Sequence, residues 1–511
     1  IRWVDCHSRV PDALTSTFNL TGTEIGELPP TLFCGEMEVP MDYSKPFDAA
    51  GNRITVGFAM NRPKKAAGLI AYHAGGPGDD AVSQAWENAL NLSSTFVGLE
   101  EFDFLALNTR GIQFSNPLNL STGFFEDVSF PFPTTEAEFT SYQTAMKNFL
   151  SAAIKDSTPP GIMKHVGTVE YVQDLDAIRS ALGYEKISIA ALSYGSFVGL
   201  EYAARYPHRV DRMVLDAVFA HGMPFQAMVS SQLAASNRLV HRADAFCQSD
   251  PTCPFYGHGN GSVVQAWKTL LSRATQSPLA APSCGPGTSC KAPVTATDLR
   301  QGATLLFIDT PDFPLFNIAL NASLHGDASL FAYRPDIDIR ETVGTPLLCN
   351  DMKVDENLKT FAGFHNLTVN ARSEDPLDIV YSDVGQLILQ CTVWPFPASV
   401  PEWKTLSTDM EFMWVTSDFD PNLATEFATF AWELTPRSTL VVRHGDDHTS
   451  LPIPPPAVTA GDIARNYLRT GLMPKPRSDT AASIFGAGGM GRSVAGAYDV
   501  PTGAVAGDVS S

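Results

Sequence analysis

The amino-acid sequence predicts an α/β fold in which a mostly parallel central sheet is interrupted by an inserted, mostly helical cap. In the first half of the 511 residues, short apolar runs alternate with segments of helical periodicity, as expected for βα units around a parallel sheet. After about Phe225, amphipathic helices, prolines and cysteines replace this alternation, which returns near Met410. The predicted parts are a first core segment (1–224), the cap (225–400), a second core segment (401–473) and an irregular tail rich in Gly, Ala and Ser (474–511).

Apolar runs bounded by turn residues mark the strands of the predicted sheet. Between them, helical periodicity is clearest in Thr168–Leu182, where Val169, Val172 and Leu175 fall on one face. Open parallel sheets place their functional groups in the loops at the carboxyl ends of strands, so these loops are where we look for chemistry. The predicted strands are 54–60, 68–73, 102–108, 187–191, 213–216, 412–416 and 440–442.

Composition narrows the class of protein. Hydrophobic residues make up 44% of the chain and charged residues 18%, which is typical of a globular protein. A formal net charge of −20 disfavours nucleic-acid binding, because a negative surface repels the phosphate backbone. No apolar run approaches the roughly 18 to 20 residues needed to cross a bilayer. We expect neither a nucleic-acid nor a membrane partner, and the sequence leaves the oligomeric state open.

The 8 cysteines and several N-glycosylation sequons favour an oxidising, extracellular compartment. The chain starts at Ile1 without Met or a signal peptide, which is consistent with a mature, secreted protein. A cytosolic protein with reduced thiols and chance sequons is the alternative. The sequons lie at Asn19, Asn91, Asn119, Asn260, Asn321 and Asn366. Sequence proximity favours the disulfides Cys247–Cys253 and Cys284–Cys290, which leaves Cys6–Cys34 and Cys349–Cys391 as longer links.

Ser193 stands where an apolar strand meets a helix. The strand Ile187–Ala191 runs directly into Leu192-Ser193-Tyr194-Gly195, and a helical pattern follows at once. This arrangement is typical of a nucleophile elbow, whose strained turn exposes the serine Oγ at a helix N-terminus. Ala191 occupies the place of the first glycine in G-x-S-x-G and adds one methyl to a crowded point. The alternative is a serine that only caps the helix.

A second glycine-rich turn, Gly75-Gly76-Pro77-Gly78, follows the predicted strand 68–73. Glycines leave backbone N–H groups unhindered and proline holds them rigid, which suits an oxyanion hole opposite the elbow. The backbone N–H of Tyr194, the residue after the nucleophile, is the second donor that we expect. A tight turn without a catalytic role is the alternative.

Acidic residues and histidines follow the last two predicted strands. Asp418 and Asp420 come after 412–416, and His444 and His448 come after 440–442. The chain order Ser, Asp, His is one in which catalytic triads occur. We prefer Asp420, because the proline after it fixes a turn, and His448, because a longer loop extends its reach.

With these residues in place, the chain resembles the prolyl-aminopeptidase and tripeptidyl-aminopeptidase branch of the α/β-hydrolases, with a TAP-like C-terminal region. The resemblance covers most of the chain, and its most specific parts are the central block 169–218 and the downstream Cys-Asn-Asp and Cys-x-x-Trp-Pro elements. The shared stretches are "CGEMEVPMDYSKP", "GGPG", "NTRGIQFS", "VEYVQDLDAIRSALGYEKISIAALSYGSFVGLEYAARYPHRVDRMVLDAV", "LLCND", "CTVWP", "SDFDP" and "GDDHTS".

The resemblance implies an α/β-hydrolase fold and a serine hydrolase that cleaves amino acids or short peptides from free N-termini without metal or organic cofactor. It implies Ser193 as nucleophile, Asp420 as acid and His448 as base. It also points to the backbones of Gly75, Gly76 and Tyr194 for the oxyanion.

Besides Ala191, four positions depart from the family pattern, and together these departures leave the substrate open. Asp79 and Asp80 replace small residues after Gly-Gly-Pro-Gly, and they are candidates for binding a substrate ammonium group. Asn108 replaces a common aspartate and Gln113 a common glycine. An esterase, lactonase or biosynthetic hydrolase with the same triad is therefore the alternative to an exopeptidase, and a non-enzymatic binding protein is the third hypothesis.

Overall fold

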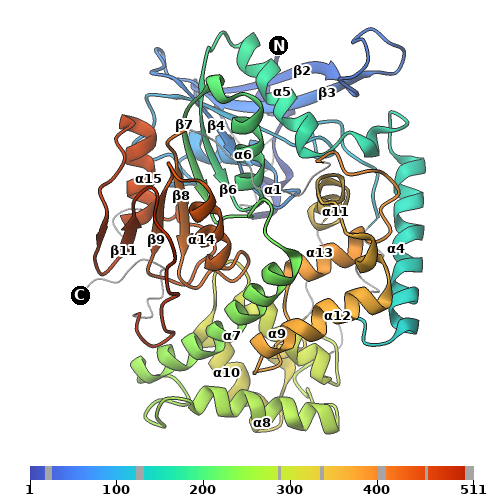
Figure 1. Ribbon diagram of the computed structural model, residues 1–511, viewed down its shortest axis with the longest axis vertical. Helices are drawn as coiled ribbons and strands as arrows, with labels where there is room; N and C mark the ends of the chain where they lie inside the picture. The colour runs from blue at the N-terminus through green and yellow to red at the C-terminus, as the bar shows by residue number, and fades with distance from the viewer. Residues whose placement is uncertain are drawn as a thin grey trace.

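A computed structural model describes residues 1–17, 26–121, 132–285, 289–333, 339–400, 410–454 and 459–500. The sequon at Asn19 and the last residues of the tail lie outside this part of the chain. The core of the described structure is a single 11-stranded sheet with the order β1-β2-β3-β5-β4-β6-β7-β8-β9-β11-β10 (Figure 1). Neighbouring strands from β5 through β9 are parallel, and the strands at both edges are antiparallel.

The sequence predicted the seven strands β3 to β9, and it missed the four at the edges. Strands β4, β5, β6, β8 and β9 are buried along their whole length, so their apolar runs are plain in the sequence. The strands are β1 (Arg2–Val4), β2 (Leu32–Pro40), β3 (Arg53–Asn61), β4 (Leu69–His73), β5 (Asp103–Leu107), β6 (Ile187–Leu192), β7 (Val210–Asp216), β8 (Met413–Ser417), β9 (Thr439–Arg443), β10 (Arg477–Ser478) and β11 (Ala482–Phe485).

The predicted irregular tail contributes two of these strands. Strand β11 pairs antiparallel with β9, and β10 closes the edge beyond it. Both strands are short and β10 is exposed, so neither carries a periodic apolar signal that the sequence could reveal.

Helices cover both faces of the sheet. Successive residues of β4 enter opposite cores: Leu69 packs in the core that contains α5, α6 and α14, and Ile70 in the core that contains α2 and α15. The core helices are α1 (Asp12–Thr17), α2 (Ala81–Ala89), α4 (Glu136–Asp156), α5 (Thr168–Ala181), α6 (Tyr194–Arg205), α14 (Thr425–Leu434) and α15 (Thr459–Thr470).

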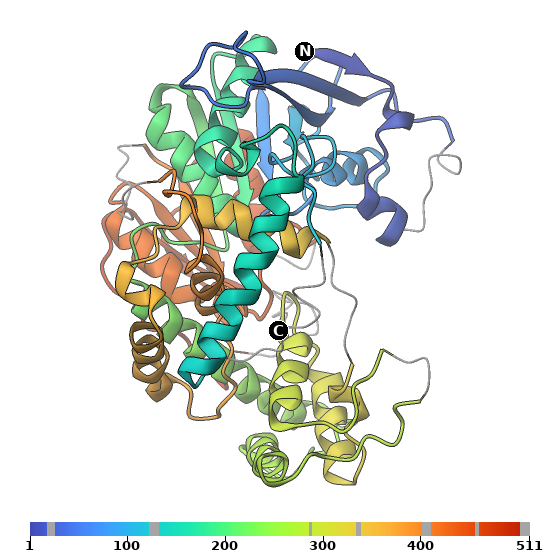
Figure 2. The ribbon, with the colours of Figure 1, turned by 90° about the vertical axis from the view of Figure 1, so that its right-hand side faces the viewer.

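The chain between β7 and β8 is mostly helical and lies at one end of the sheet (Figures 1 and 2). Its helices α7 to α10 surround a separate apolar core. Helix α4 runs beside α12, where Gln143 donates to the Lys359 carbonyl at 3.2 Å. The helices of this region are α7 (Phe225–Ser249), α8 (Ser262–Gln276), α9 (Ala296–Phe307), α10 (Phe313–Leu324), α11 (Ile339–Asp351), α12 (Phe361–Ala371) and α13 (Asp383–Cys391).

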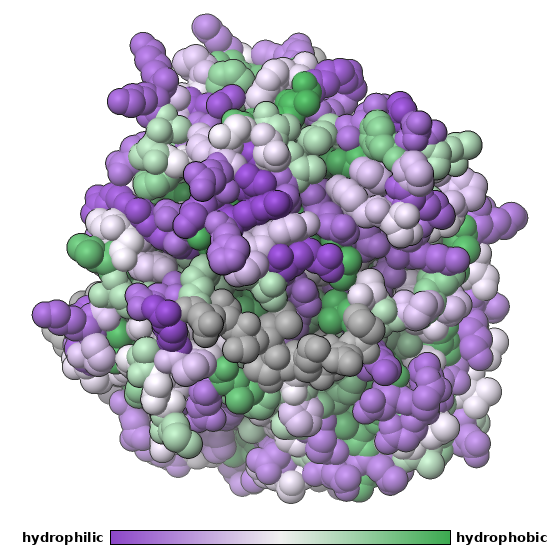
Figure 3. Space-filling model, turned by 45° about the horizontal axis from the view of Figure 1, so that its top comes forward, coloured by the Kyte–Doolittle hydropathy of each residue, from purple (hydrophilic) through white to green (hydrophobic). Residues whose placement is uncertain are grey.

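All four predicted cysteine pairings are confirmed as disulfides: Cys6–Cys34, Cys247–Cys253, Cys284–Cys290 and Cys349–Cys391. The last one joins α11 to α13. Within the described residues, no helix combines the length and apolar character needed to cross a bilayer. The face shown in Figure 3 is dominated by hydrophilic residues, with hydrophobic ones scattered among them.

Candidate active site

Ser193 lies in the sharp turn between β6 and α6. Its backbone has φ 55° and ψ −128°, a region that costs a residue with a side chain about 1–3 kcal/mol and that persists only where its surroundings enforce it. The Ser193 N–H donates to the carbonyl of Asp216 at 2.8 Å, which fixes the turn to the carboxyl end of β7. This strained serine has the backbone geometry of a nucleophile elbow.

Glycines make room for this turn on two sides. A Cβ on Gly75 would lie 2.8 Å from the Leu192 carbonyl oxygen and 2.8 Å from Ser193 Cβ, so the glycine-rich loop after β4 touches the elbow directly. The methyl of Ala191 is buried on the side of Gly199 in the facing helix, where even an added Cβ would lie 3.6 Å away, an ordinary contact distance. Ala191 is therefore accommodated at the strand–helix crossing.

His73 holds the glycine-rich loop, and the sequence analysis did not single it out. The Gly75 N–H donates to His73 Nδ1 at 3.1 Å, and Thr109 Oγ1 lies 3.4 Å from Nε2. Burial lowers the pKa of His73 to about 4, so the ring is neutral and can accept that hydrogen bond. Because the Gly75 N–H has this partner, the geometry favours Gly76 over Gly75 as the oxyanion donor of the loop. A histidine that ends a buried strand was the signal available in the sequence.

The four acid and histidine candidates form two separate pairs. His448 Nδ1 lies 2.9 and 3.0 Å from the two carboxylate oxygens of Asp420. His444 Nδ1 lies 2.6 Å from Asp418 Oδ2, and its other nitrogen is 3.0 Å from Ser483 Oγ on β11. Within the described part of the chain, Nε2 of His448 has no hydrogen-bond partner, which leaves it able to accept a proton.

Asp420 is fully buried, and its carboxylate has backbone hydrogen-bond donors. Its Oδ1 accepts hydrogen bonds from the backbone N–H groups of Asn422 and Leu423, each at 2.8 Å. Burial lowers the pKa of His448, but the charge and hydrogen bond of Asp420 and the charges of Asp309 and Asp216 outweigh it and raise that pKa to about 9. The surroundings thus stabilise the imidazolium that forms when a histidine acts as general base.

Asp216 and Arg443 hold the loop that carries His448, and both escaped the sequence analysis. Asp216 Oδ2 accepts from the backbone N–H groups of Ser450 at 2.8 Å and Leu451 at 2.7 Å. Arg443, fully buried, donates to Ser450 Oγ and to the Asp447 carbonyl, both at 2.9 Å. Asp216 therefore contacts the elbow through its carbonyl and the histidine loop through its carboxylate.

The two acids after Gly-Gly-Pro-Gly differ in their surroundings. Asp80 caps helix α2, because its Oδ1 accepts from the Val82 N–H at 3.1 Å, and burial raises its pKa to about 6. Asp79 is exposed. The carboxylates with the largest effects on the pKa of His448 are Asp420, Asp309 and Asp216.

Two acids from the cap act on His448, and no sequence pattern predicted them. The Asp309 carbonyl accepts from the His448 backbone N–H at 2.9 Å, and its side chain accepts from Asn422 Nδ2 at 2.5 Å. Asp383, the first residue of α13, interacts electrostatically with both His448 and Asp309. Both acids lie far from His448 along the chain, so no local motif could reveal them.

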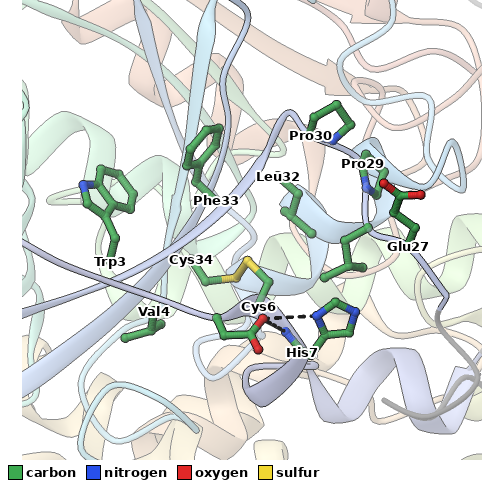
Figure 4. A pocket seen from close by; sticks show the side chains of 12 residues that line it. Trp3, Val4, Cys6, His7, Glu27, Pro29, Pro30, Leu32, Phe33 and Cys34 are labelled. Carbon is green, nitrogen blue, oxygen red and sulfur yellow. Dashed lines mark hydrogen bonds and ion pairs between the residues drawn. A yellow bond between two sulfur atoms is a disulfide. The ribbon is translucent and has the colours of Figure 1, made fainter.

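A hollow in the surface beside β1 and β2 lies away from this cluster (Figure 4). Its lining offers neither a serine nor a free thiol, since Cys6 and Cys34 are joined in a disulfide. Strands β3, β5 and β4 separate it from β6 in the sheet. This hollow therefore lacks the kind of nucleophile that the elbow presents.

Comparison with known families agrees with this geometry. A family model described as "alpha/beta hydrolase fold" matches residues 69–288, which contain β4 and the elbow. The chain is an α/β-hydrolase. A second model, described as "TAP-like protein", matches residues 379–481, which contain Asp420 and His448. The α/β-hydrolase thus carries a TAP-like region at the part of the chain that completes the candidate site.

Several curated proteins are similar to this α/β-hydrolase. Serine protease Hip1 of Mycobacterium tuberculosis is 27% identical over 278 residues, which cover 53% of this chain and 49% of that protein. Tripeptidyl aminopeptidase of Streptomyces lividans is 27% identical over 268 residues, covering 49% of this chain and 48% of the relative. The putative hydrolase YuaR of Escherichia coli is 26% identical over 260 residues, 49% of each chain. The matched region spans about half the length of these relatives.

Replacing the acid of each Asp–His pair should distinguish the two pairs. Asp420→Asn should lower kcat by about 10⁴, because the amide no longer orients and stabilises the His448 imidazolium. Asp418→Asn should change kcat less than about tenfold, because His444 is directed at Ser483 instead. Steady-state hydrolysis of an aryl ester by both variants measures the difference, and the reverse order of effects would make His444 the base.

Adding one methyl at Gly75 should disable the elbow. Gly75→Ala should lower turnover by about 10² or more, since the methyl would displace Leu192 or Ser193. Gly98→Ala is the matched control, because Gly98 also has a positive φ of +80° but nothing within 4 Å of an added Cβ. Both variants carry the same kind of backbone strain, so equal activities would show that the loop does not position the nucleophile.

Proposed function

We propose that the protein is a secreted serine exopeptidase that releases amino acids or short peptides, up to tripeptides, from free N-termini. The observation that carries this proposal is the hydrogen-bonded Asp420–His448 pair. Asp216 connects this pair to the elbow, because it binds both the loop that carries His448 and the strained turn that carries Ser193. Sequence order favours Ser193, Asp420 and His448; the strained backbone supports Ser193, and the hydrogen bond supports the Asp420–His448 pair.

In the proposed mechanism, Ser193 Oγ attacks the scissile carbonyl while His448 Nε2 accepts its proton. Asp420 orients the ring through Nδ1 and stabilises the imidazolium. The N–H groups of Tyr194 and Gly76 hold the oxyanion, and the imidazolium then protonates the leaving amine. Water then attacks the acyl-enzyme: His448 accepts a proton from the water and returns it to Ser193 Oγ as the acyl bond breaks, which releases the N-terminal fragment.

The curated relatives favour a peptide substrate. Two of them are named as a serine protease and a tripeptidyl aminopeptidase, and the TAP-like model matches the end of the cap and the second core segment. An ester, a lactone or a biosynthetic intermediate is the alternative substrate for the same triad. Four disulfides, together with sequons that are exposed at Asn91, Asn119, Asn260 and Asn366 and half-buried at Asn321, support secretion.

We assign recognition of the free N-terminus to Asp309 and Asp383 in place of Asp79 and Asp80. Both cap acids act on His448, and burial raises the pKa of Asp383 to about 6 although the charge of His448 opposes that rise. A substrate ammonium group between the two acids would add a second cation. It would also offset the charges that raise the pKa of His448, and so favour the neutral imidazole that attack requires.

A substrate profile tests the proposed activity. In a series of peptide arylamides of one to four residues, those of up to three residues should release the arylamine when the N-terminus is free, and the four-residue one should release little. Blocking the N-terminus should slow release at least about tenfold, because a blocked amine cannot pair with the cap acids. A fluorophosphonate should label the wild type and not Ser193→Ala. Hydrolysis of aryl esters alone would refute the exopeptidase, and persistent labelling of Ser193→Ala would exclude that serine as nucleophile.

Charge removal at Asp383 tests the ammonium site. Asp383→Asn should raise KM for free-N-terminal arylamides about tenfold and leave KM for N-blocked aryl esters unchanged. In the wild type, the same KM should rise as the pH falls through about 6, because Asp383 becomes protonated there and its attraction for the ammonium is lost. The variant should lack this pH dependence. Asp79→Asn is the control. A larger rise in KM for Asp79→Asn than for Asp383→Asn would indicate that Asp79 in the glycine-rich loop recognises the ammonium group.

A further inference from the structure

The side chain of Tyr194 takes part in a buried polar cluster that the proposed mechanism does not use. Its hydroxyl donates to Asp351 Oδ2 in a short hydrogen bond and lies 2.9 Å from Thr168 Oγ1. Thr168 donates to the same carboxylate twice, from its backbone N–H at 2.9 Å and from Oγ1 at 2.7 Å. The exposed fractions of Tyr194, Thr168 and Asp351 are 3%, 2% and 1%. The carboxylate thus has three donors and almost no contact with solvent.

The three residues come from three separate elements. Thr168 begins α5 and Tyr194 begins α6, both in the core, whereas Asp351 ends α11 of the cap. The elements approach closely here, since a Cβ on Gly167 would lie 2.7 Å from Asp351 Oδ1. Two residues before Asp351, Cys349 is bonded to Cys391 at the end of α13. The disulfide therefore fixes the cap helix that reaches Tyr194.

Holding the Tyr194 side chain also fixes the backbone of the first residue of α6. The ring is stacked on Phe197 at an interplanar angle of 14° and meets His73 edge-on at 6.2 Å between centroids. With its hydroxyl anchored as well, the residue has little freedom to turn. Its backbone N–H follows Ser193 directly, so its direction decides whether it points at a developing oxyanion.

We propose that Asp351 is a positioning residue through which the cap orients the oxyanion-binding N–H of Tyr194. In this arrangement α11 of the cap holds the Tyr194 N–H in the direction that the oxyanion hole requires. Attack by Ser193 is fast only while α11 packs against the start of α6. The inference rests on the proposed serine-hydrolase chemistry, and it holds equally for a peptide or an ester substrate. A purely apolar contact would pack these helices equally well, whereas the hydrogen bond from the Tyr194 hydroxyl to the buried Asp351 carboxylate also fixes the orientation of the side chain.

Isosteric variants test this role without opening a cavity. Tyr194→Phe and Asp351→Asn should each slow phosphonylation of Ser193 by a fluorophosphonate about tenfold or more, a part of the 10² to 10³ that a lost oxyanion donor costs. With an aryl ester, kcat should fall by a similar factor while KM stays within about twofold. The double variant should be no slower than either single one, because both remove the same hydrogen bond.

Thr168 and the disulfides provide matched controls. Thr168→Ser keeps the hydroxyl and should retain the wild-type rate, whereas Thr168→Val should slow phosphonylation. Replacing Cys349 and Cys391 by alanine should slow it too, and replacing Cys247 and Cys253, a pair elsewhere in the cap, should not. Thermal unfolding of each variant separates misalignment from loss of the fold.

The outcomes distinguish this inference from the proposed function. Wild-type protein that is not phosphonylated would refute the serine hydrolase and the inference together. Wild-type protein that reacts normally, with Tyr194→Phe and Asp351→Asn within twofold of it, would overturn only the role of Asp351. Fully additive losses in the double variant would also overturn it, because two independent effects would then replace one shared hydrogen bond.

Discussion

The candidate site depends on one buried carboxylate at the end of β7. Asp216 binds the Ser193 N–H through its carbonyl and the amides of Ser450 and Leu451 through its side chain. Strand β7 lies between β6 and β8, so its end is the point where the elbow and the acid-bearing loop are nearest. Burying a carboxylate is costly, and the two backbone donors offset that cost only while the histidine loop keeps its place. The strained turn and the loop are thus fixed to each other.

The cap contributes carboxylates to a site that the core alone would leave incomplete. Asp309 and Asp383 place negative charge beside His448, and Asp351 holds Tyr194. Helices α11 and α13, which carry Asp351 and Asp383, are joined by Cys349–Cys391. Charges in a poorly solvated space act strongly on one another, so Asp309 and Asp383 alter the basicity of His448 and, in the proposed function, attract a substrate cation.

Much of the core could be predicted because its strands are buried on both faces. Continuous apolar runs marked β4, β5 and β6, and the helical period of 168–182 marked α5, which ends at Ala181. Edge strands β1 and β10 are short and largely exposed, so packing gives their sequences no period. Ala191 was harder to judge, because whether its methyl fits depends on how closely helix α6 packs against β6, which no local pattern reveals.

The sequence by itself determined the residues whose role depends on their immediate neighbours. Ser193 is recognisable because strand, strained turn and helix follow within a few residues, and Gly75 because it begins a Gly-Gly-Pro-Gly turn directly after a strand. Tertiary structure alone decided which aspartate pairs with which histidine, and that Asp216, Asp309, Asp351 and Asp383 surround the site. These contacts join residues far apart along the chain, and a pairing made by folding leaves no periodic or local pattern in either partner.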